Sequence, residues 1–279
     1  MKEKIMKIVF MIAACFSIAA VILICLFLFA NGVPAIAEIG PFKFLLGTQW
    51  KPSQNLFGIL PMILGSLYVT AGAIMVGVPT GILTAIYLAR FCPKNIYKIL
   101  KPAIDLLAGI PSVVYGFFGL VVLVPFIRDT FDGGQGSILT ASLLLGIMIL
   151  PTIIGVSESA LRAVPESYYE GSLALGATHE RSVFFAMLPA AKSGILAGIV
   201  LGIGRAVGEA MAVIMVAGNQ PRMPIGLFEG ARTLTTNIVM EMGYAADLHR
   251  EALIATAVVL FVFILIINTA FSQLKRRAV

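Results

Sequence analysis

Charged residues are scarce in this chain. They make up 12% of its 279 residues, whereas a soluble domain carries about 25%. Hydrophobic residues make up 59%, and the mean hydropathy is +0.99. These values exclude an ordinary soluble protein and indicate an integral membrane protein. Apolar stretches of about 20 residues or more, without alternating polar positions, favour a bundle of transmembrane helices over a β-barrel.

Cysteine and histidine are also sparse, with three and two residues. No Cys-x-x-Cys spacing or Cys/His cluster occurs, so the sequence predicts neither a disulfide nor a metal site. His179 and His249 both fall outside the expected membrane core, so no nucleophile and base for an intramembrane enzyme are visible. The chain lacks a Walker A loop, so we expect no enzyme here, and any ATP and Mg²⁺ would be bound by a partner subunit.

Acidic residues are fewer than basic ones, which gives a net charge of +6. The basic residues lie at the ends of apolar stretches, a pattern that sets membrane topology and does not indicate nucleic-acid binding. Thirteen of the 20 Lys and Arg residues fall on one predicted side, six fall on the other, and Arg205 lies within a stretch. Because positive charge stays inside, both termini and the polar segment 162–189 are predicted to be cytoplasmic.

Six apolar stretches predict six membrane spans. They cover residues 8–30, 58–89, 102–127, 138–161, 190–217 and about 251–271. We divide the chain into an N-terminal span with an outer segment, residues 1–57, and a core, residues 58–279. A cleaved signal peptide is the alternative for the first stretch, but its 23 residues exceed the usual apolar region of about 7 to 15. Residues 34–46 are expected on the membrane surface, with Phe42, Phe44 and Trp50 as interfacial aromatics.

Several spans contain residues that interrupt or fix a helix. Pro79 is expected to bend the long second span. Residues 109–116 of the third span contain a Gly-x-Pro-Ser break, which is either a packing kink or backbone against protein or a wet cavity. In the fourth span, Glu158 and Arg162 are four residues apart with the acid first, the favourable helical order. This spacing predicts an ion pair at the inner interface, with a transport role as the alternative.

The fifth stretch differs from the others. Gly194, Gly198 and Gly202 recur every four residues, which predicts close packing against another helix and a central position. Arg205 and Glu209 lie one helical turn apart near its midpoint. An Arg at the membrane centre costs about 3 kcal/mol, so one interpretation is a salt bridge with Glu209. The other is an anion pathway, because the planar guanidinium fork matches tetrahedral oxyanions. Residues 218–249 would then form an outer loop, with 233–242 as a short surface helix.

The polar segment between the fourth and fifth spans has its own pattern. Residues 168–175 favour a helix, Gly176 ends it, and Thr178 can cap a second helix. Two short helices in water form a compact projection, which we call the knob. The spacing of Glu170, Gly176, Leu188 and Pro189 resembles the EAA coupling loop of ABC importer permeases, which docks on the ATPase subunit. Gly171 and Ser172 replace the usual Ala-Ala of that loop.

Longer segments extend this resemblance. GRAVGEAMAVIMVAGN (204–219), AGIPSVVYG (108–116), LPTIIGVSESALRAVP (150–165) and GSLALGATHE (171–180) resemble the PstC-type permease subunits of bacterial phosphate ABC importers. The resemblance covers most of residues 58–272. It implies an all-α transmembrane bundle with the type I, MetI-like permease fold in the bacterial cytoplasmic (inner) membrane. Arg205 and Glu209 match the family's Arg and Glu, whereas Ala210 stands where the family usually has Thr.

The resemblance also implies a function and partners. The expected function is import of inorganic phosphate, in a heterodimer with a PstA-like permease. Two copies of a PstB-like ATPase and an external PstS-like phosphate-binding protein complete the expected complex, with membrane lipid around it. A permease for another oxyanion, molybdate or sulfate, is the first alternative. A secondary anion transporter is a further alternative, but it is expected to show paired repeats and does not need the knob.

Overall fold

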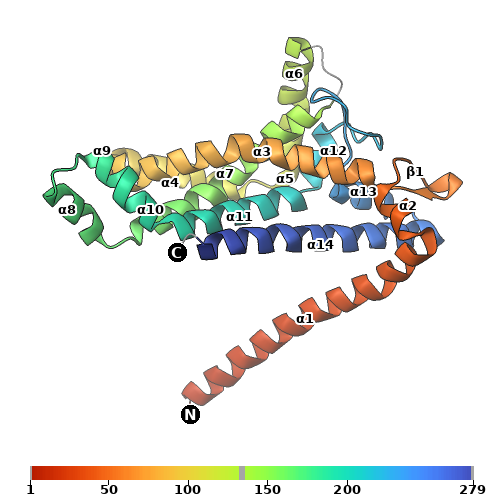
Figure 1. The fold of residues 1–279 in the computed structure, drawn as a ribbon, viewed down its shortest axis with the longest axis horizontal. Helices are drawn as coiled ribbons and strands as arrows, with labels where there is room; N and C mark the ends of the chain where they lie inside the picture. Colours follow the sequence, from red (N-terminus) through yellow and green to blue (C-terminus); the bar gives the residue numbers. More distant parts are fainter. Residues whose placement is uncertain (1, 132–135, 278–279) are drawn as a thin grey trace.

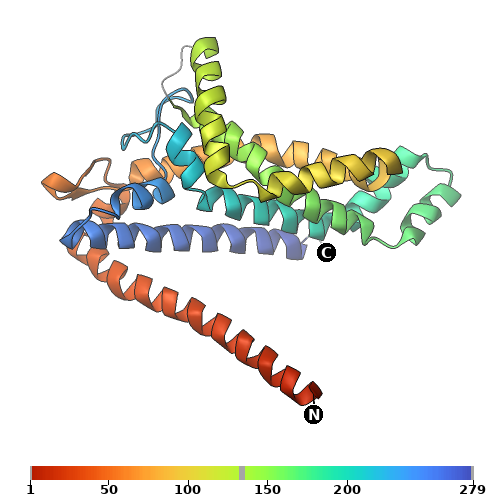
Figure 2. The same cartoon turned by 180° about the vertical axis from the view of Figure 1, so that it is seen from behind.

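The computed structural model describes residues 2–131 and 136–277 and shows a helical membrane protein (Figure 1). In this described part, five helices are long and apolar enough to cross a membrane, or six if the bent pair His179–Ala190 and Lys192–Gly208 counts as one span. This agrees with the predicted helical bundle. Helices α3, α7, α11 and α14 run side by side along the long axis (Figures 1 and 2).

The elements follow one another along the chain, and the longest connection in the described part, residues 217–233, lies between α12 and α13. In order they are α1 (Lys2–Ile39), α2 (Pro41–Leu46), β1 (Trp50–Lys51), the 3-10 turn η1 (Pro52–Gln54), β2 (Leu56–Phe57), α3 (Leu60–Ile86), the π-helical turn η2 (Tyr87–Phe91), α4 (Lys94–Gly109), α5 (Ser112–Phe118), the π-helical turn η3 (Gly119–Leu123), α6 (Val124–Phe131), α7 (Ile138–Arg162), α8 (Glu166–Ala174), α9 (His179–Ser182), the π-helical turn η4 (Val183–Met187), α10 (Leu188–Ala190), α11 (Lys192–Gly208), α12 (Met211–Val216), α13 (Leu234–Glu241) and α14 (Asp247–Arg277).

Helix α1 is the least packed of the long helices. It contacts α14 near its C-terminal end and diverges from it toward the N-terminus (Figure 1). A methyl group at Gly32 would lie 2.6 Å from Val258 of α14, so glycine allows the two helices to approach. The helix continues through Pro34 to Ile39. The first residues of the predicted surface segment 34–46 therefore extend α1, because a membrane helix tolerates an internal proline.

The outer segment folds back onto the bundle after α1. Strands β1 and β2 pair antiparallel, with Trp50 opposite Phe57. Phe44 and Trp50 are buried, at 0% and 4% exposed, whereas Phe42 remains 82% exposed. The prediction of interfacial aromatics is therefore wrong for Phe44 and Trp50, which pack in a core with Ile59 and Met62.

Glycine determines how closely the central helices pack. A methyl group at Gly198 of α11 would lie 3.1 Å from Val156 of α7, and one at Gly202 would lie 2.9 Å from Ile153. The same Ile153 side chain also limits the space at Gly81 of α3, at 2.8 Å. Helix α7 thus packs closely against both α3 and α11, and the predicted close approach of α11 is confirmed.

The third span is shorter than predicted, because the chain breaks within it. Helix α4 ends at Gly109, and the span-length helix runs from Ser112 to Phe131. Pro111 has no N–H and caps α5 in an extended conformation. The Tyr115 hydroxyl donates to the Leu107 carbonyl oxygen at 2.9 Å. The break predicted at residues 109–116 is therefore present, and a side chain satisfies one of the carbonyls beside it.

Candidate functional site

The fifth apolar stretch is not one helix. The chain bends by 70° between α10 and α11, and it breaks again where α11 ends at Gly208 and α12 begins at Met211. The expectation of a continuous span over residues 190–217 is therefore wrong. Glu209 has extended backbone angles, φ −73° and ψ 126°. Its carboxylate Oε1 accepts the backbone N–H of Ala212 at 3.1 Å, so this side chain starts the next helix.

The break separates Arg205 from Glu209. Both residues lie in the described part of the chain, and they form no ion pair with each other there. Instead, Arg205 Nη1 donates to Thr152 Oγ1 on α7 at 3.5 Å. The Thr235 hydroxyl of α13 donates to the backbone oxygen of Glu209 at 3.0 Å. Arg205 and Glu209 therefore lie at a junction of α7, α11, α12 and α13, and both are partly exposed.

Helix α13 lies within the packed protein. Leu234, Thr235, Thr236, Asn237 and Glu241 are buried. The prediction of a short surface helix at residues 233–242 is correct in position and wrong in exposure. The burial of α13 is not apparent from the sequence, because a helix with two threonines, an asparagine and a glutamate has too few apolar side chains to indicate burial.

Glu241 at the end of α13 is the centre of a buried network, which we call the outer network. Its Oε2 accepts Trp50 Nε1 at 2.8 Å and lies 2.8 Å from His249 Nε2. Its Oε1 pairs with Arg232 Nη1. Arg232 also donates to Asn237 Oδ1 at 3.0 Å and, through Nε, to the backbone oxygen of Asn219 at 3.1 Å. The network joins the hairpin, the loop before α13, α13 itself and α14.

A second buried carboxylate lies near the other end of the bundle. Glu158 Oε1 accepts Arg162 Nε at 2.9 Å and the Tyr97 hydroxyl at 2.7 Å, and its Oε2 lies 3.3 Å from Lys101 Nζ. We call these four residues the inner network. The structure thus contains the ion pair expected of Glu158 and Arg162. Arg162 Nη2 also donates to the Leu88 backbone oxygen at 2.9 Å. The bond to Glu158 is the main reason that the pKa of Tyr97 is raised.

The knob has the form that the sequence predicts. Helix α8 ends before Gly176, whose φ is +84°, and Thr178 accepts the backbone N–H of Arg181 at the start of α9. The backbone N–H of Glu180 and the Thr178 hydroxyl hold the pKa of Glu180 below its usual value. Leu175 is 91% exposed at the tip of the turn.

The knob is attached to the end of α3 by contacts that sequence reasoning missed. Arg90 Nη1 lies 3.0 Å from Glu166 Oε2 at the start of α8. The Tyr169 hydroxyl is 2.7 Å from His179 Nδ1, and the His179 ring meets the Phe91 ring at 4.7 Å between centroids. Of the residues predicted for the coupling loop, Glu170 and Pro189 are exposed and Leu188 is half-buried. Pro189 directly precedes the 70° bend.

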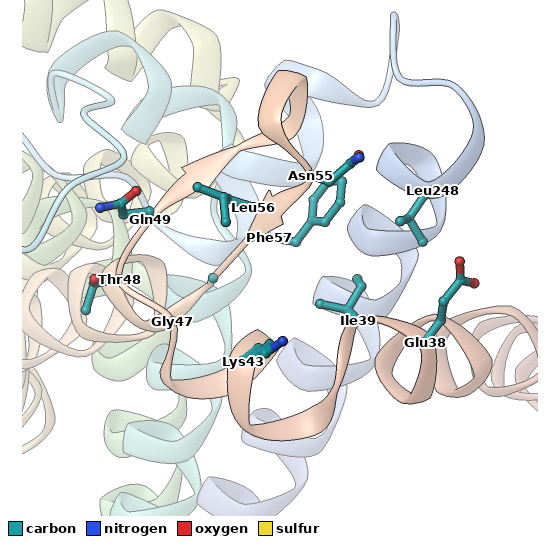
Figure 3. Close-up of a pocket in the computed structure, with 11 residues that line it drawn as sticks. Glu38, Ile39, Lys43, Gly47, Thr48, Gln49, Asn55, Leu56, Phe57 and Leu248 are labelled. Carbon is teal, nitrogen blue, oxygen red and sulfur yellow. The ribbon is translucent and has the colours of Figure 1, made fainter.

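A cavity of about 510 Å³ opens beside the hairpin (Figure 3). Its lining includes Glu38 at the end of α1, Lys43 of α2, Phe57 of β2 and Leu248 of α14. None of the predicted site residues lines it, so it does not belong to the junction around Arg205.

These features define a class of protein. Long apolar helices, one broken beside an intramembrane arginine, together with a polar helical knob, are the parts of a membrane transport subunit. The chain belongs to the family of binding-protein-dependent transport system inner membrane components, whose profile matches residues 77–279. It is therefore a multi-span permease subunit of an ABC importer. ATP hydrolysis takes place on a separate subunit, and the complex includes that ATPase and a binding protein.

Relatives and solved structures agree with this membership. A probable ABC transporter permease protein YqgH of Bacillus subtilis is 40% identical, over 92% of this chain and 87% of its own length. A phosphate transport system permease protein PstC of Mesorhizobium japonicum is 36% identical, over 86% and 80%. An inward-facing MetNI methionine ABC transporter is 21% identical, covers 83% of this chain and 100% of its own, and has a TM-score of 0.61. The MetI-like fold expected from the sequence is confirmed.

Proposed function

We propose that this permease subunit moves inorganic phosphate and that Arg205 attracts the anion. The observation that carries the proposal is the surroundings of Arg205. Within the described part of the chain, its guanidinium bonds to the neutral hydroxyl of Thr152 and to no carboxylate. A partly exposed guanidinium without a counter-charge leaves most of its five donors free, and such a planar group pairs well with a tetrahedral oxyanion. Relatives named as phosphate permeases support the same substrate.

Glu209 favours phosphate over other oxyanions. A deprotonated carboxylate repels a fully ionised anion such as sulfate, but it can accept a hydrogen bond from the P–OH group of hydrogen phosphate. Glu209 Oε1 already accepts a hydrogen bond from the Ala212 N–H, so Oε2 is the candidate acceptor for the P–OH group. A permease for sulfate or molybdate remains the alternative substrate assignment. A secondary transporter is set aside, because the chain belongs to the ABC importer family.

The knob is proposed to dock on the ATPase subunit. Glu170 lies on α8, Gly176 follows its C-terminal end, and Leu188 and Pro189 lie on α10, which supports this docking role. The exposed Leu175 supplies an apolar tip for a groove on the partner. Glu158 and Arg162 would anchor the base of the knob, since Arg162 ends α7 and also donates to the Leu88 backbone oxygen in η2.

The proposed complex follows from these roles. Two permeases form a heterodimer, with a PstA-like subunit beside this one. Two PstB-like ATPases bind the cytoplasmic knobs, and a PstS-like binding protein delivers phosphate from outside. Both termini of this chain lie on the cytoplasmic side, as the distribution of positive charge predicts.

Transport of labelled anions tests the substrate. Vesicles that contain the purified complex are given ATP inside and radiolabelled phosphate, sulfate or molybdate outside, each with the binding protein. We expect ATP-dependent uptake of phosphate that a hundredfold excess of sulfate does not compete away. Vesicles loaded with ADP serve as the control. Uptake of sulfate or molybdate in preference to phosphate would contradict the proposal.

A further inference from the structure

The hydroxyl of Thr152 on α7 lies against the guanidinium of Arg205 on α11. Arg205 Nη1 is 3.5 Å from Thr152 Oγ1. In this contact the guanidinium donates and the hydroxyl oxygen accepts, so the hydroxyl proton of Thr152 is left for another acceptor. Within residues 2–131 and 136–277, Thr152 donates that proton to no atom. The proton is therefore available to a group that binds beside Arg205.

The orientation of Thr152 differs from that of other threonines inside helices. A helical threonine commonly donates to the carbonyl oxygen four residues earlier. Thr80, Thr84 and Thr256 do so, at 2.6, 2.8 and 2.8 Å. In the described part of the chain Thr152 makes no such bond, and its oxygen contacts the neighbouring helix instead. The side chain is thus directed at Arg205 and not at its own backbone.

Arg205 brings further donors to the same place. A guanidinium carries five N–H donors in one plane, and the contact with Thr152 uses one of them. Both side chains are partly exposed, so a ligand can reach them. An oxyanion accepts hydrogen bonds from several donors at once, and bonds to a charged group are stronger than neutral ones. The guanidinium and the hydroxyl together match the oxygens of one tetrahedral anion.

The space beside this pair is open. A Cβ added at Gly155, Gly204 or Gly208 would meet no atom within 4 Å. Gly155 lies three residues after Thr152 on α7, and Gly208 lies three residues after Arg205 on α11, so each glycine is on the same side of its helix as the polar residue. The glycines earlier along α11 are instead packed against α7. An anion held by Arg205 therefore has room on the side where Thr152 lies.

We propose that Thr152 is a second contact for the transported oxyanion. Its O–H donates to one oxygen of phosphate while the fork of Arg205 donates to others, and its oxygen keeps the guanidinium in place. A hydroxyl adds a directional bond without a second positive charge, which suits a site that must also release its ligand. The inference rests on the proposed function, because it takes Arg205 as the point that the anion passes.

Protection of a cysteine by phosphate tests the contact. Thr152→Cys is made in a chain whose three native cysteines are replaced by serine, and the purified complex in detergent is treated with a small thiol reagent. We expect millimolar inorganic phosphate to slow labelling at least about threefold, as binding at about twice the dissociation constant would. Chloride at the same ionic strength should have no effect. Adding Arg205→Gln should remove the protection, because the anion then loses its charged partner.

The matched control retains Cys92 as the single cysteine and keeps Thr152. Cys92 is also partly exposed, at the cytoplasmic end of η2, and phosphate should not change its labelling rate. Equal labelling of Thr152→Cys with and without phosphate, in a complex that co-purifies with the ATPase, would overturn the contact. Equal slowing of Cys92 would do the same, because the effect would then not be local.

Uptake by hydroxyl variants gives the second readout. Thr152→Val keeps the shape of the side chain and removes the donor, so phosphate uptake per assembled complex should fall at least about tenfold. Thr152→Ser keeps the donor and should stay within about twofold of the unmodified rate. Thr256→Val is the control, because that threonine is buried and bonds its own helix. If Thr152→Val fails to assemble, Thr152→Ala takes its place with the same expected loss.

The outcomes distinguish this contact from the proposed function. Protection of Thr152→Cys by sulfate in preference to phosphate would keep the contact and contradict the choice of anion. Normal uptake by assembled Thr152→Val or Thr152→Ala, together with loss of uptake in Arg205→Ala, would overturn the contact and leave the proposed function intact. Loss of uptake in Thr152→Val with rescue in Thr152→Ser is the result that the contact predicts.

Discussion

The inner and outer networks are two solutions to the same problem. Each places a carboxylate in the interior of a membrane protein and surrounds it with three partners. The partners of Glu241 come from β1, the loop before α13 and α14, whereas those of Glu158 come from α4 and from α7 itself. Glu158 is 3% exposed and Glu241 is 8% exposed. The partners differ, because the side chain of Arg162 is 47% exposed, whereas that of Arg232 is 10% exposed. The inner network reaches water and the outer network is enclosed.

This difference determines what each network can tolerate. A charge that loses its partner near water is screened and resolvated. A charge that loses its partner in an enclosed site keeps most of its desolvation penalty. The inner network is therefore suited to anchor the knob through the docking that we propose for it. The outer network is suited to hold one defined arrangement until several partners release together.

Arg232→Met should have the largest effect on stability. It leaves Glu241 buried with Trp50 and His249 alone, and the loss of one partner of a buried pair costs about 3–5 kcal/mol. The free energy of unfolding of the detergent-solubilised complex measures it. The double variant Arg232→Met/Glu241→Leu should recover part of the loss, because no charge is then left buried. Equal stability of the single and double variants would show that the pair is not enclosed.

Arg162→Met is the matched change at the inner end and should cost about 1–2 kcal/mol. Glu158 keeps the Tyr97 hydroxyl at 2.7 Å and Lys101 at 3.3 Å, and the removed guanidinium was already near water. The same unfolding measurement gives the value. If the loss matches that of Arg232→Met, the contrast between the two networks is wrong.

Gly176→Val should cost about as much stability as Arg162→Met and should have a large effect on coupling. Its φ of +84° lies in the left-handed region, where a side chain costs about 1–2 kcal/mol, although no neighbouring atom obstructs it. Because the turn sets the angle between α8 and α9, we expect ATP hydrolysis to continue while phosphate uptake falls. Gly243→Val is the control, since Gly243 lies outside the knob, has no positive φ and also has open space. Normal uptake by Gly176→Val would contradict the role of the knob in coupling.

Much of the fold follows from local patterns in the sequence. Span positions depend on runs of apolar residues, and the knob depends on Gly176 and Thr178, whose roles are local. The pair of Glu158 and Arg162 was predictable for the same reason, because i,i+4 spacing places both side chains on one helical face. The stripe of Gly198 and Gly202 likewise indicated close packing before any partner helix was known.

The outer network and the break at Glu209 were not predictable from local patterns. Trp50 and Glu241 are 191 residues apart, so no spacing rule connects them. The break cannot be read from the sequence, because most residues on both sides of it are apolar. The Glu209 carboxylate accepts a backbone N–H at the start of α12, which no spacing rule predicts. The i,i+4 spacing of Arg205 and Glu209 suggested a pair that the extended backbone at Glu209 removes.

The central claim is that phosphate passes Arg205. It is tested most directly by ATP-dependent phosphate uptake per assembled complex, with assembly measured separately by co-purification of the ATPase. We expect Arg205→Ala to assemble and to lose uptake to background. Arg205→Lys should restore little, because an ammonium group cannot reproduce the planar donor fork. Uptake by assembled Arg205→Ala at the unmodified rate would contradict the claim.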